Sequence, residues 1–335
     1  MNEYTKIFID EKYPYFIDKY LNTKTLCRLK HVSQFCGCDY SKLYSPRFFY
    51  SRFDHSLTIA HMTWHFTKNK EETIAALLHD VGTPCFAHTI DFVLNDHINQ
   101  ESSEKNITDL IKQDEELLLY LHEDNIPLDN LNDLNKYPIL ENKSPNLCAD
   151  RLDGVLHTCY IWLHTNSLEE IKTIYKNISV LTNESNKLEL GFNNIDICEK
   201  FTQMVKIYAE ELQSCEPSYI LEYICEVIKK SIDKGLFTFK DLYIKKEKDI
   251  IDIIKRNFET WAIFSESKEL IRTNKKPNQF SISVNTKKRN VIPLVKINNN
   301  IKRINEVSSK SNNLYLKLKQ FKDSKYAYIE KIKNI

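Results

Sequence analysis

Apolar residues recur along much of this chain at spacings of three and four, the period of a helix with one buried face. The clearest case starts at His55, from which Ile59, Met62 and Phe66 follow at positions i+4, i+7 and i+11. This pattern predicts a helix in which His55 points the same way as the core side chains.

A second helix is predicted from Lys70, with acidic residues in its first turn and Gly82 as its C-terminal stop. His79 and Asp80 fall in its last turn, about 100° apart around the axis. Two neighbouring side chains at a helix end can both reach an ion that lies off that end.

Further helices are predicted over residues 11–35, from 86 past 93, and over 106–122, 144–162, 195–212, 219–232 and 248–264, with a loop over 123–143. The composition changes near Thr273, and short strands are predicted over 280–284, 291–295 and 313–318. We therefore expect a mainly α protein, with a helical domain over 1–265 and a small α/β or β appendage over 266–335.

The length of 335 residues suits one large domain, or one domain with an appendage. The net charge of +1 implies no polyanionic partner, but the predicted appendage is clearly basic. One interpretation of its Lys and Arg residues is a solvated face or a subunit contact. The other is a surface for nucleic acid or nucleotide phosphate, which no RNA-recognition or helix-turn-helix signature supports.

The start of the chain lacks a basic segment followed by an apolar stretch, so no signal peptide is expected. No run reaches the roughly 18 apolar residues that cross a bilayer, so no membrane partner is expected either. The nine cysteines are odd in number and scattered through apolar segments, which favours buried thiols in a cytoplasmic protein. Cys36-Gly37-Cys38 lacks a second Cys or His pair at zinc spacing.

Two ionisable residues at the end of an apolar helix lose hydration, and a bound metal ion is the offset that we expect. Our hypothesis is that His55, His79, Asp80 and Asp150 converge on one divalent cation. Alternatives exist for each residue taken alone. His55 would be a core histidine, Asp80 would pair with His79, and Arg151 would neutralise Asp150.

Four motifs occur in order along the chain: Leu26-Cys27-Arg28-Leu29 with Gln34, Arg52-Phe53-Asp54-His55-Ser56-Leu57, Leu77-Leu78-His79-Asp80-Val81-Gly82 and Ala149-Asp150-Arg151-Leu152-Asp153. This ordered set resembles the HD-domain metal-dependent phosphohydrolases. The closest likeness is to their deoxynucleoside-triphosphate triphosphohydrolase branch, the dGTPase and SAM-and-HD-domain type. The resemblance covers roughly residues 15–255.

The resemblance implies that the four residues named above bind one divalent ion, with Fe, Mn, Ni, Co, Zn or Mg as candidates. It also implies a substrate that is a nucleotide or a phosphorylated small molecule, and a homo-oligomer. The residues to which it assigns further roles are Arg28, Arg52 and Arg151 on substrate phosphates, Gln34 on the sugar, and His88, Asp91 and His97 in proton transfer near the phosphate chain.

Several positions depart from the family pattern. Thr83 stands where a proton-transferring histidine is usual, and a hydroxyl does not titrate near neutral pH. A family His-Glu pair is replaced by Gln100-Glu101, with His97 close enough to substitute. Gly154 replaces a tyrosine beside the sugar and Thr158 replaces an aspartate, so we expect a wider pocket.

Three functions are consistent with these residues. The first is a metal-dependent phosphohydrolase, similar to the triphosphohydrolases, in which activated water attacks phosphorus. The second is a catalytically impaired nucleotide-binding or regulatory protein, which Thr83 and Gly154 motivate. The third is an HD-fold oxygenase with two irons, for which His88, His97 and His122 lack a convincing spacing.

Overall fold

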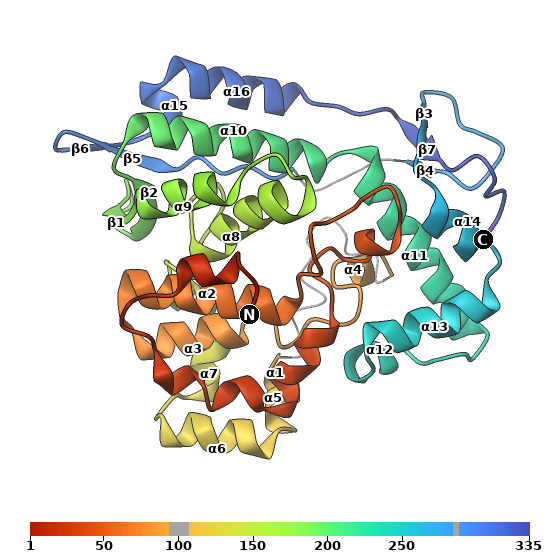
Figure 1. Ribbon diagram of the computed structural model, residues 1–335, viewed down its shortest axis with the longest axis horizontal. Helices are drawn as coiled ribbons and strands as arrows, with labels where there is room; N and C mark the ends of the chain where they lie inside the picture. Colours follow the sequence, from red (N-terminus) through yellow and green to blue (C-terminus); the bar gives the residue numbers. More distant parts are fainter. Residues whose placement is uncertain (94–106, 284–287) are drawn as a thin grey trace.

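A computed structural model describes residues 1–93, 107–283 and 288–335, except for the side chains of residues 91 and 92 (Figure 1). At its centre are α2 (Arg52–Thr67) and α3 (Lys70–Leu78), which lie side by side. A capping box of Ser51 and Asp54 starts α2, and the Asn69 side chain caps α3. Both predicted helices are therefore confirmed, although the α-helix ends at Leu78 rather than at Gly82.

The third element at the centre is α8 (Ala149–His157), which continues into a π-helical turn over Thr158–Trp162. The sequence predicted that this helix begins near residue 144, which is wrong. The backbone before α8 is engaged elsewhere, because the N–H of Leu147 donates to the Glu189 carboxylate and the N–H of Ala149 donates to the Ile139 carbonyl.

The long helix predicted over residues 11–35 is also wrong. This segment contains short 3-10 turns at Tyr15–Ile17, Tyr20–Asn22 and Leu29–His31, and only α1 (Lys24–Arg28) is α-helical. The chain changes direction repeatedly in this segment. Its buried residues, among them Ile17, Tyr20 and Leu29, are therefore spaced too irregularly for one helix face.

The helices predicted over 195–212 and 219–232 are found with shifted ends, whereas a helix over Leu128–Asn132 contradicts the loop predicted over 123–143. Two predicted helices are each broken in two: Asp114 caps a new helix within the first, and the chain becomes extended at Phe258 within the second. The helices are α4 (Thr89–Val93), α5 (Ile107–Lys112), α6 (Glu115–Glu123), α7 (Leu128–Asn132), α9 (Leu168–Lys176), α10 (Ile195–Glu211), α11 (Cys215–Asp233), α12 (Asp241–Ile244), α13 (Glu247–Asn257), α14 (Thr260–Glu266), α15 (Ile304–Val307) and α16 (Ser309–Gln320).

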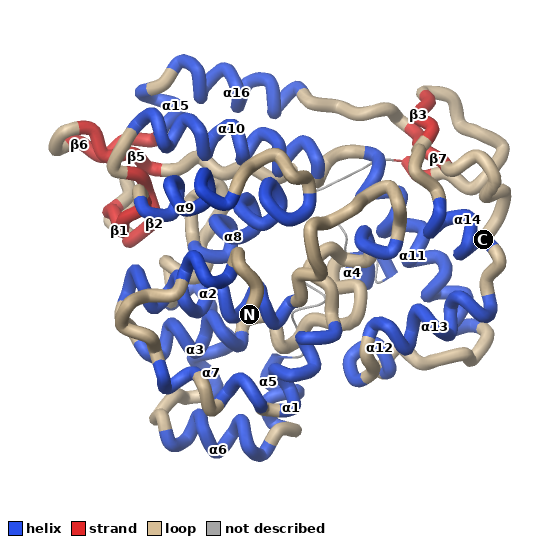
Figure 2. The backbone as a smooth tube through the Cα atoms, viewed as in Figure 1, coloured by secondary structure: helices blue, strands red, loops and turns tan. Residues whose placement is uncertain are grey.

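Two small sheets lie at opposite ends of the molecule (Figure 2). One has the order β1-β2-β5-β6, and its strands are β1 (Ile178–Thr182), β2 (Leu188–Phe192), β5 (Leu294–Ile297) and β6 (Asn300–Arg303). The other has the order β3-β7-β4, with β3 (Ile271–Thr273), β4 (Ile282–Ser283) and β7 (Tyr326–Tyr328). The mainly α fold with small sheets is therefore confirmed.

The strand predicted over residues 313–318 is wrong, because these residues lie within α16. Ser308 caps this helix, and Tyr315 and Leu318, three residues apart, are its buried apolar residues. That spacing belongs to a helix rather than to a strand. The other two predicted strands correspond to β4 and β5 with shifted ends.

The first sheet joins segments from both sides of the predicted boundary at residue 265. In it, β2 pairs in parallel with β5, with Gly191 opposite Leu294. The Arg303 side chain reinforces this junction through hydrogen bonds to Glu189, Glu184 and Asn146. The C-terminal segment is thus packed against the loop that leads into α8, and the division into two domains stays a prediction.

All nine cysteines are free thiols, and seven of them are buried. Within the described residues, no helix is both long enough and apolar enough to cross a membrane.

Candidate metal centre

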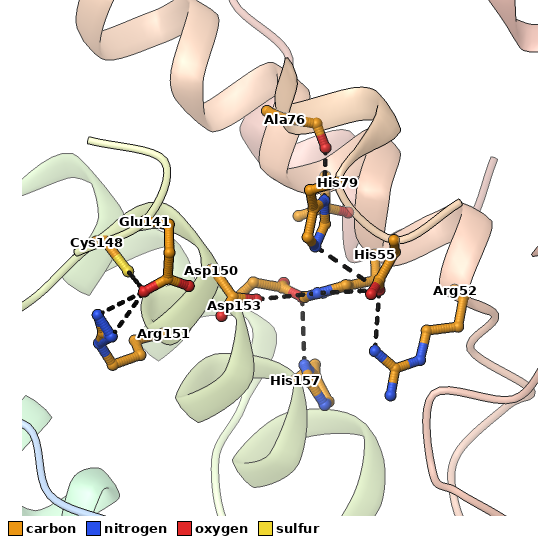
Figure 3. Close-up of polar contacts among 12 residues, drawn as sticks. Arg52, His55, Ala76, His79, Glu141, Cys148, Asp150, Arg151, Asp153 and His157 are labelled. Carbon is orange, nitrogen blue, oxygen red and sulfur yellow. Dashed lines mark hydrogen bonds and ion pairs between the residues drawn. The ribbon is translucent and has the colours of Figure 1, made fainter. Parts of the chain in front are cut away.

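The four residues proposed as metal ligands meet around the Nε2 atom of His55 (Figure 3). This atom lies 3.1 Å from Oδ1 of Asp150 and 3.9 Å from Oδ2 of Asp80. The same Asp80 oxygen lies 3.7 Å from Nε2 of His79. Residues separated by almost 100 positions in sequence are therefore brought together by α2, the end of α3 and the first turn of α8.

Both imidazoles are oriented so that Nε2 faces this cluster. In His79, Nδ1 donates to the Ala76 carbonyl at 2.7 Å, and in His55, Nδ1 lies 2.6 Å from the Asp153 carboxylate. Such hydrogen bonds fix the ring and its tautomer in metal sites. His55, His79 and Asp80 each offer a donor atom within 4.8 Å of the others, a grouping that could hold a metal ion. Asp150 joins this group through His55 alone, at 3.1 Å.

Asp153 anchors the side of His55 that faces away from the cluster. Its side chain is fully buried, and it accepts hydrogen bonds from the hydroxyls of Tyr4 at 2.6 Å and Tyr50 at 3.3 Å. His157 lies 3.2 Å away on the next turn of α8. His55, Asp153 and His157 could also hold an ion, but the enclosure of Asp153 and its two tyrosine partners favour a supporting role.

The carboxylates dominate the electrostatics of the cluster. Burial opposes charging of His55, but Asp150 and Asp153 outweigh this effect and raise its pKa to about 10. Burial likewise opposes ionisation of Asp80, yet the neighbouring Arg52 and the two histidines hold the pKa of Asp80 well below its usual range. The carboxylates of Asp80 and Asp150 therefore stay ionised near neutral pH and stabilise a positive charge between them, which a metal ion would supply in place of the His55 proton.

Arg52 and Thr83 hold Asp80 from two directions. A guanidinium N–H of Arg52 donates to Oδ2 at 2.9 Å, and the Thr83 hydroxyl donates to Oδ1 at 3.0 Å. Both side chains are buried. Thr83 thus orients a proposed ligand, which is a role that the sequence comparison with a family histidine did not reveal.

Two further residues that were predicted to bind substrate, Arg28 and Gln34, each have a buried polar atom without a hydrogen-bond partner in the described structure. Arg28 donates to the carbonyls of Val81 and Thr83, just after His79 and Asp80, at 2.9 and 2.7 Å. The unpartnered atoms are Nη1 of Arg28 and Oε1 of Gln34. Such groups are available to a ligand or an ordered water, and the predicted roles of both residues stay predictions.

Arg151 is engaged by a carboxylate that the sequence did not single out. Its guanidinium makes two hydrogen bonds to one oxygen of Glu141, at 2.7 and 3.0 Å, and its Nε donates to the Asn146 carbonyl (Figure 3). A phosphate would have to compete with Glu141 for this cation. The predicted contact of Arg151 with substrate stays a prediction.

The residues predicted for proton transfer are described only in part. His88 is half-buried in the turn before α4, and its backbone N–H donates to the Cys36 thiol. The Asp91 side chain and the whole of His97 lie outside the described residues.

Gly154 is not beside an open space, and the wider pocket expected at this position stays a prediction. The hydroxyl of Tyr208, on α10, lies 3.6 Å from the position that a Cβ atom at Gly154 would take, and its ring carbons are within 4.0 Å. A tyrosine from another helix therefore fills the space above Gly154.

Sequence reasoning also missed Asp153, His157 and the two tyrosines that support His55. Asp153 follows Asp150 by three residues, and His157 follows Asp153 by four. These spacings place the side chains on neighbouring turns of one helix and could have indicated that they lie close together. Tyr4 and Tyr50 carry no such signal, because tertiary packing alone brings them to Asp153.

No known family model matches this chain. The chain is 25% identical over 252 residues to the uncharacterized protein YdhJ of Bacillus subtilis (strain 168), and the match covers 73% of this chain and 74% of that protein. The structure of the present chain is similar to the crystal structure of a phosphohydrolase, BT4208, from Bacteroides thetaiotaomicron VPI-5482. The TM-score is 0.57 at 15% identity, with 95% of each chain covered. The chain therefore shares the fold of a solved phosphohydrolase over nearly its whole length.

Proposed function

We propose that this protein is a metal-dependent phosphohydrolase that acts on a phosphate ester or anhydride. The substrate that we propose is a nucleotide, with deoxynucleoside triphosphates as the first candidates because of the sequence motifs. His55, His79, Asp80 and Asp150 would bind one divalent ion.

The observation that carries this proposal is the orientation of the two imidazoles. Each of His55 and His79 uses Nδ1 for a hydrogen bond to a supporting oxygen. Nε2 of His55 then faces Asp150 and Asp80, and Nε2 of His79 faces Asp80. The fold shared with a solved phosphohydrolase supports the same function.

A divalent ion in this position would polarise a phosphoryl oxygen and lower the pKa of a water molecule. The protein's own residues would hold the ion and position the substrate. Arg52 fixes the Asp80 carboxylate, and the buried Nη1 of Arg28 is available for a phosphate oxygen. The hydrogen bonds that Arg52 makes to Asp80 and that Arg28 makes to the Val81 and Thr83 carbonyls would keep these groups in place.

The test is hydrolysis by the full-length protein of a panel of nucleotides and of bis-p-nitrophenyl phosphate, with Mn²⁺, Fe²⁺, Ni²⁺, Co²⁺, Zn²⁺ and Mg²⁺ supplied separately. We expect metal-dependent product release that His79→Ala abolishes. His122→Ala, which changes an exposed histidine on α6, is the matched control and should keep the activity. Equal activity of His79→Ala and the wild type would refute the proposal.

A nucleotide-binding or regulatory protein without turnover is the second candidate, and Thr83 is the observation in its favour. The Thr83 hydroxyl donates to Asp80 and sits where a proton-transferring histidine is usual in the family that the motifs resemble. This alternative predicts that nucleotides raise the melting temperature without any product being formed. Multiple turnovers by the purified protein would exclude it.

A further inference from the structure

The helix α8 begins without the kind of side-chain cap that starts α2 and α3. Cys148, the residue before its first turn, makes no capping hydrogen bond within the described structure. Carbonyls of an earlier segment accept instead. The N–H of Ala149 donates to Ile139 at 2.7 Å, and that of Asp150 donates to Leu140 at 3.3 Å. Because the N–H groups of a first helical turn need acceptors outside the helix, this segment fixes where α8 begins.

The acidic first turn of α3 holds the same segment from the other side. Oε1 of Glu72 accepts a hydrogen bond from the N–H of Leu140 at 3.2 Å. One position earlier, the Glu71 carboxylate accepts a hydrogen bond from the Tyr137 hydroxyl at 2.6 Å. The segment over residues 137–140 is therefore attached to α3 at two points.

Leu140 connects Glu72 directly to a proposed metal ligand. Its N–H donates to Glu72, and its carbonyl accepts from the N–H of Asp150. Oδ1 of Asp150 in turn lies 3.1 Å from Nε2 of His55. Thus α3 supports the centre at both ends, because His79 follows its last residue and Asp150 is held from its first turn (Figure 3).

The helix dipole alone does not explain the place of Glu72. A carboxylate in a first turn is stabilised by the dipole, but it can stay in water, as Glu115 does on α6. Glu72 is only 6% exposed. Burial raises the pKa of Glu72, and the groups that oppose this effect are backbone N–H groups rather than a cation. Burying a carboxylate costs free energy, and the hydrogen bond to Leu140 is the contact that this burial makes possible.

We propose that Glu72 is a positioning residue for the metal centre, and that it acts on Asp150 through Leu140. This inference rests on the proposed function, since it concerns the same centre. Without the Glu72 oxygen, the N–H of Leu140 would lose its acceptor, and the carbonyl that receives the N–H of Asp150 would lose its support. Asp150 would keep its side chain but lose a fixed position relative to His55.

The experiment measures the Zn²⁺ affinity of the full-length protein by competition with a chromophoric chelator. Glu72→Leu favours a helix and fills much of the same space, but it offers no acceptor. We expect its Kd to rise about tenfold or more, the usual effect of removing a group that orients a metal ligand. Glu72→Gln keeps an acceptor oxygen for Leu140, so its Kd should stay within about threefold of the wild type. Glu115→Leu is the matched control and should leave the Kd unchanged.

Two results would overturn the inference. One is a wild-type Kd for Glu72→Leu. The other is an equal loss of affinity in Glu72→Leu and Glu72→Gln, because the amide oxygen keeps the hydrogen bond to Leu140. All measurements are made at a temperature where circular dichroism shows the native helix content, so that unfolding does not contribute to the loss.

A double-mutant cycle tests whether Glu72 acts through Asp150. In Asp150→Ala the ligand is already absent, so adding Glu72→Leu should change the Kd by less than about twofold. A further loss as large as that of Glu72→Leu alone would show that Glu72 supports the fold or another ligand. That result would also overturn the inference.

Failure of the proposed function is distinguishable from failure of this inference. A wild-type protein that binds Zn²⁺ but hydrolyses no phosphate compound would refute the proposed hydrolysis and leave the comparison of Glu72 variants intact. A wild-type protein that binds no metal would refute the centre itself, and the inference with it, before any variant is compared.

Discussion

The Nδ1 atom of His55 lies 2.6 Å from the Oδ2 atom of Asp153, and the Asp153 side chain is fully buried. This pair joins the first half of α2 to the first turns of α8 and turns the other nitrogen of His55 toward Asp150. A residue outside the proposed ligand set thus determines how one ligand faces the metal centre.

Replacing Asp153 by asparagine should weaken metal binding without removing a ligand. An amide cannot match the charged acceptor that holds the His55 ring, and losses of about 10- to 100-fold in metal affinity are typical for such supporting residues. The measurement is competition for Mn²⁺ or Zn²⁺ with a chromophoric chelator. Asp129→Asn, an exposed substitution on α7, should leave the affinity unchanged. Identical affinities for the wild type and Asp153→Asn would contradict the supporting role.

Tyr4→Phe should destabilise the fold, because Tyr4 donates to the buried Asp153 carboxylate at 2.6 Å. Removing a hydrogen bond to a charged group costs about 1.5–3 kcal/mol of unfolding free energy. Urea unfolding of the two proteins measures this difference. Tyr15→Phe is a fitting control, since Tyr15 is 77% exposed and should change the stability very little. A Tyr4→Phe protein as stable as the control would argue against the hydrogen bond.

The parts of the centre that follow from local sequence could be predicted. The four-residue spacing from His55 to Ile59 indicated a buried histidine, and His79-Asp80 at the end of an apolar helix indicated two further ligands. Both predictions of position are found in the structure, because the period of a regular helix determines which residues share a face.

The parts that depend on tertiary packing could not be predicted in this way. Tyr4 reaches Asp153 from a 3-10 turn near the start of the chain, and Tyr208 fills the space above Gly154 from a helix more than 50 residues downstream. Among the fold errors, the segment over 313–318 alternates apolar and polar residues over a short run, where strand and helix patterns overlap. Its capping residue, Ser308, was the signal that would have indicated a helix.

Stability should depend on pH through Glu247, whose side chain is buried beside the backbone N–H of Phe86, 2.8 Å away. Burial and the charge of Asp39 raise the pKa of Glu247 above its ordinary value of 4.5. The folded state therefore binds this proton more tightly than the unfolded state. Its contribution to stability is complete below about pH 4.5 and is lost as the pH rises through the raised value.

Glu247→Gln tests this dependence, because glutamine is neutral at every pH and has a similar shape. Unfolding free energies should be measured at pH 5 and pH 8 for both proteins. The wild type should lose more stability than Glu247→Gln over this interval, by up to about 1.4 kcal/mol per pH unit. Parallel behaviour of the two proteins would show that Glu247 does not titrate with a raised pKa.

Arg303→Gln should unfold more easily, because the buried Glu189 would lose its cationic partner. Arg303 makes hydrogen bonds to both oxygens of Glu189, at 2.6 and 2.9 Å. Removal of one member of a buried ion pair typically costs about 3–5 kcal/mol. Thermal or urea unfolding checks this value against Lys302→Gln, which alters an exposed neighbour on the same strand. Equal stability of the two variants would mean that the C-terminal strands do not depend on this pair.

The metal content of the purified protein tests the central claim most directly. Elemental analysis by mass spectrometry should be made on the wild type, Asp80→Asn and His122→Ala after reconstitution and removal of free metal. We expect about one transition-metal ion per chain in the wild type and in His122→Ala, and a large loss of that ion in Asp80→Asn. A wild-type protein without bound metal, or an Asp80→Asn protein that retains the full amount, would contradict a centre built from His55, His79, Asp80 and Asp150.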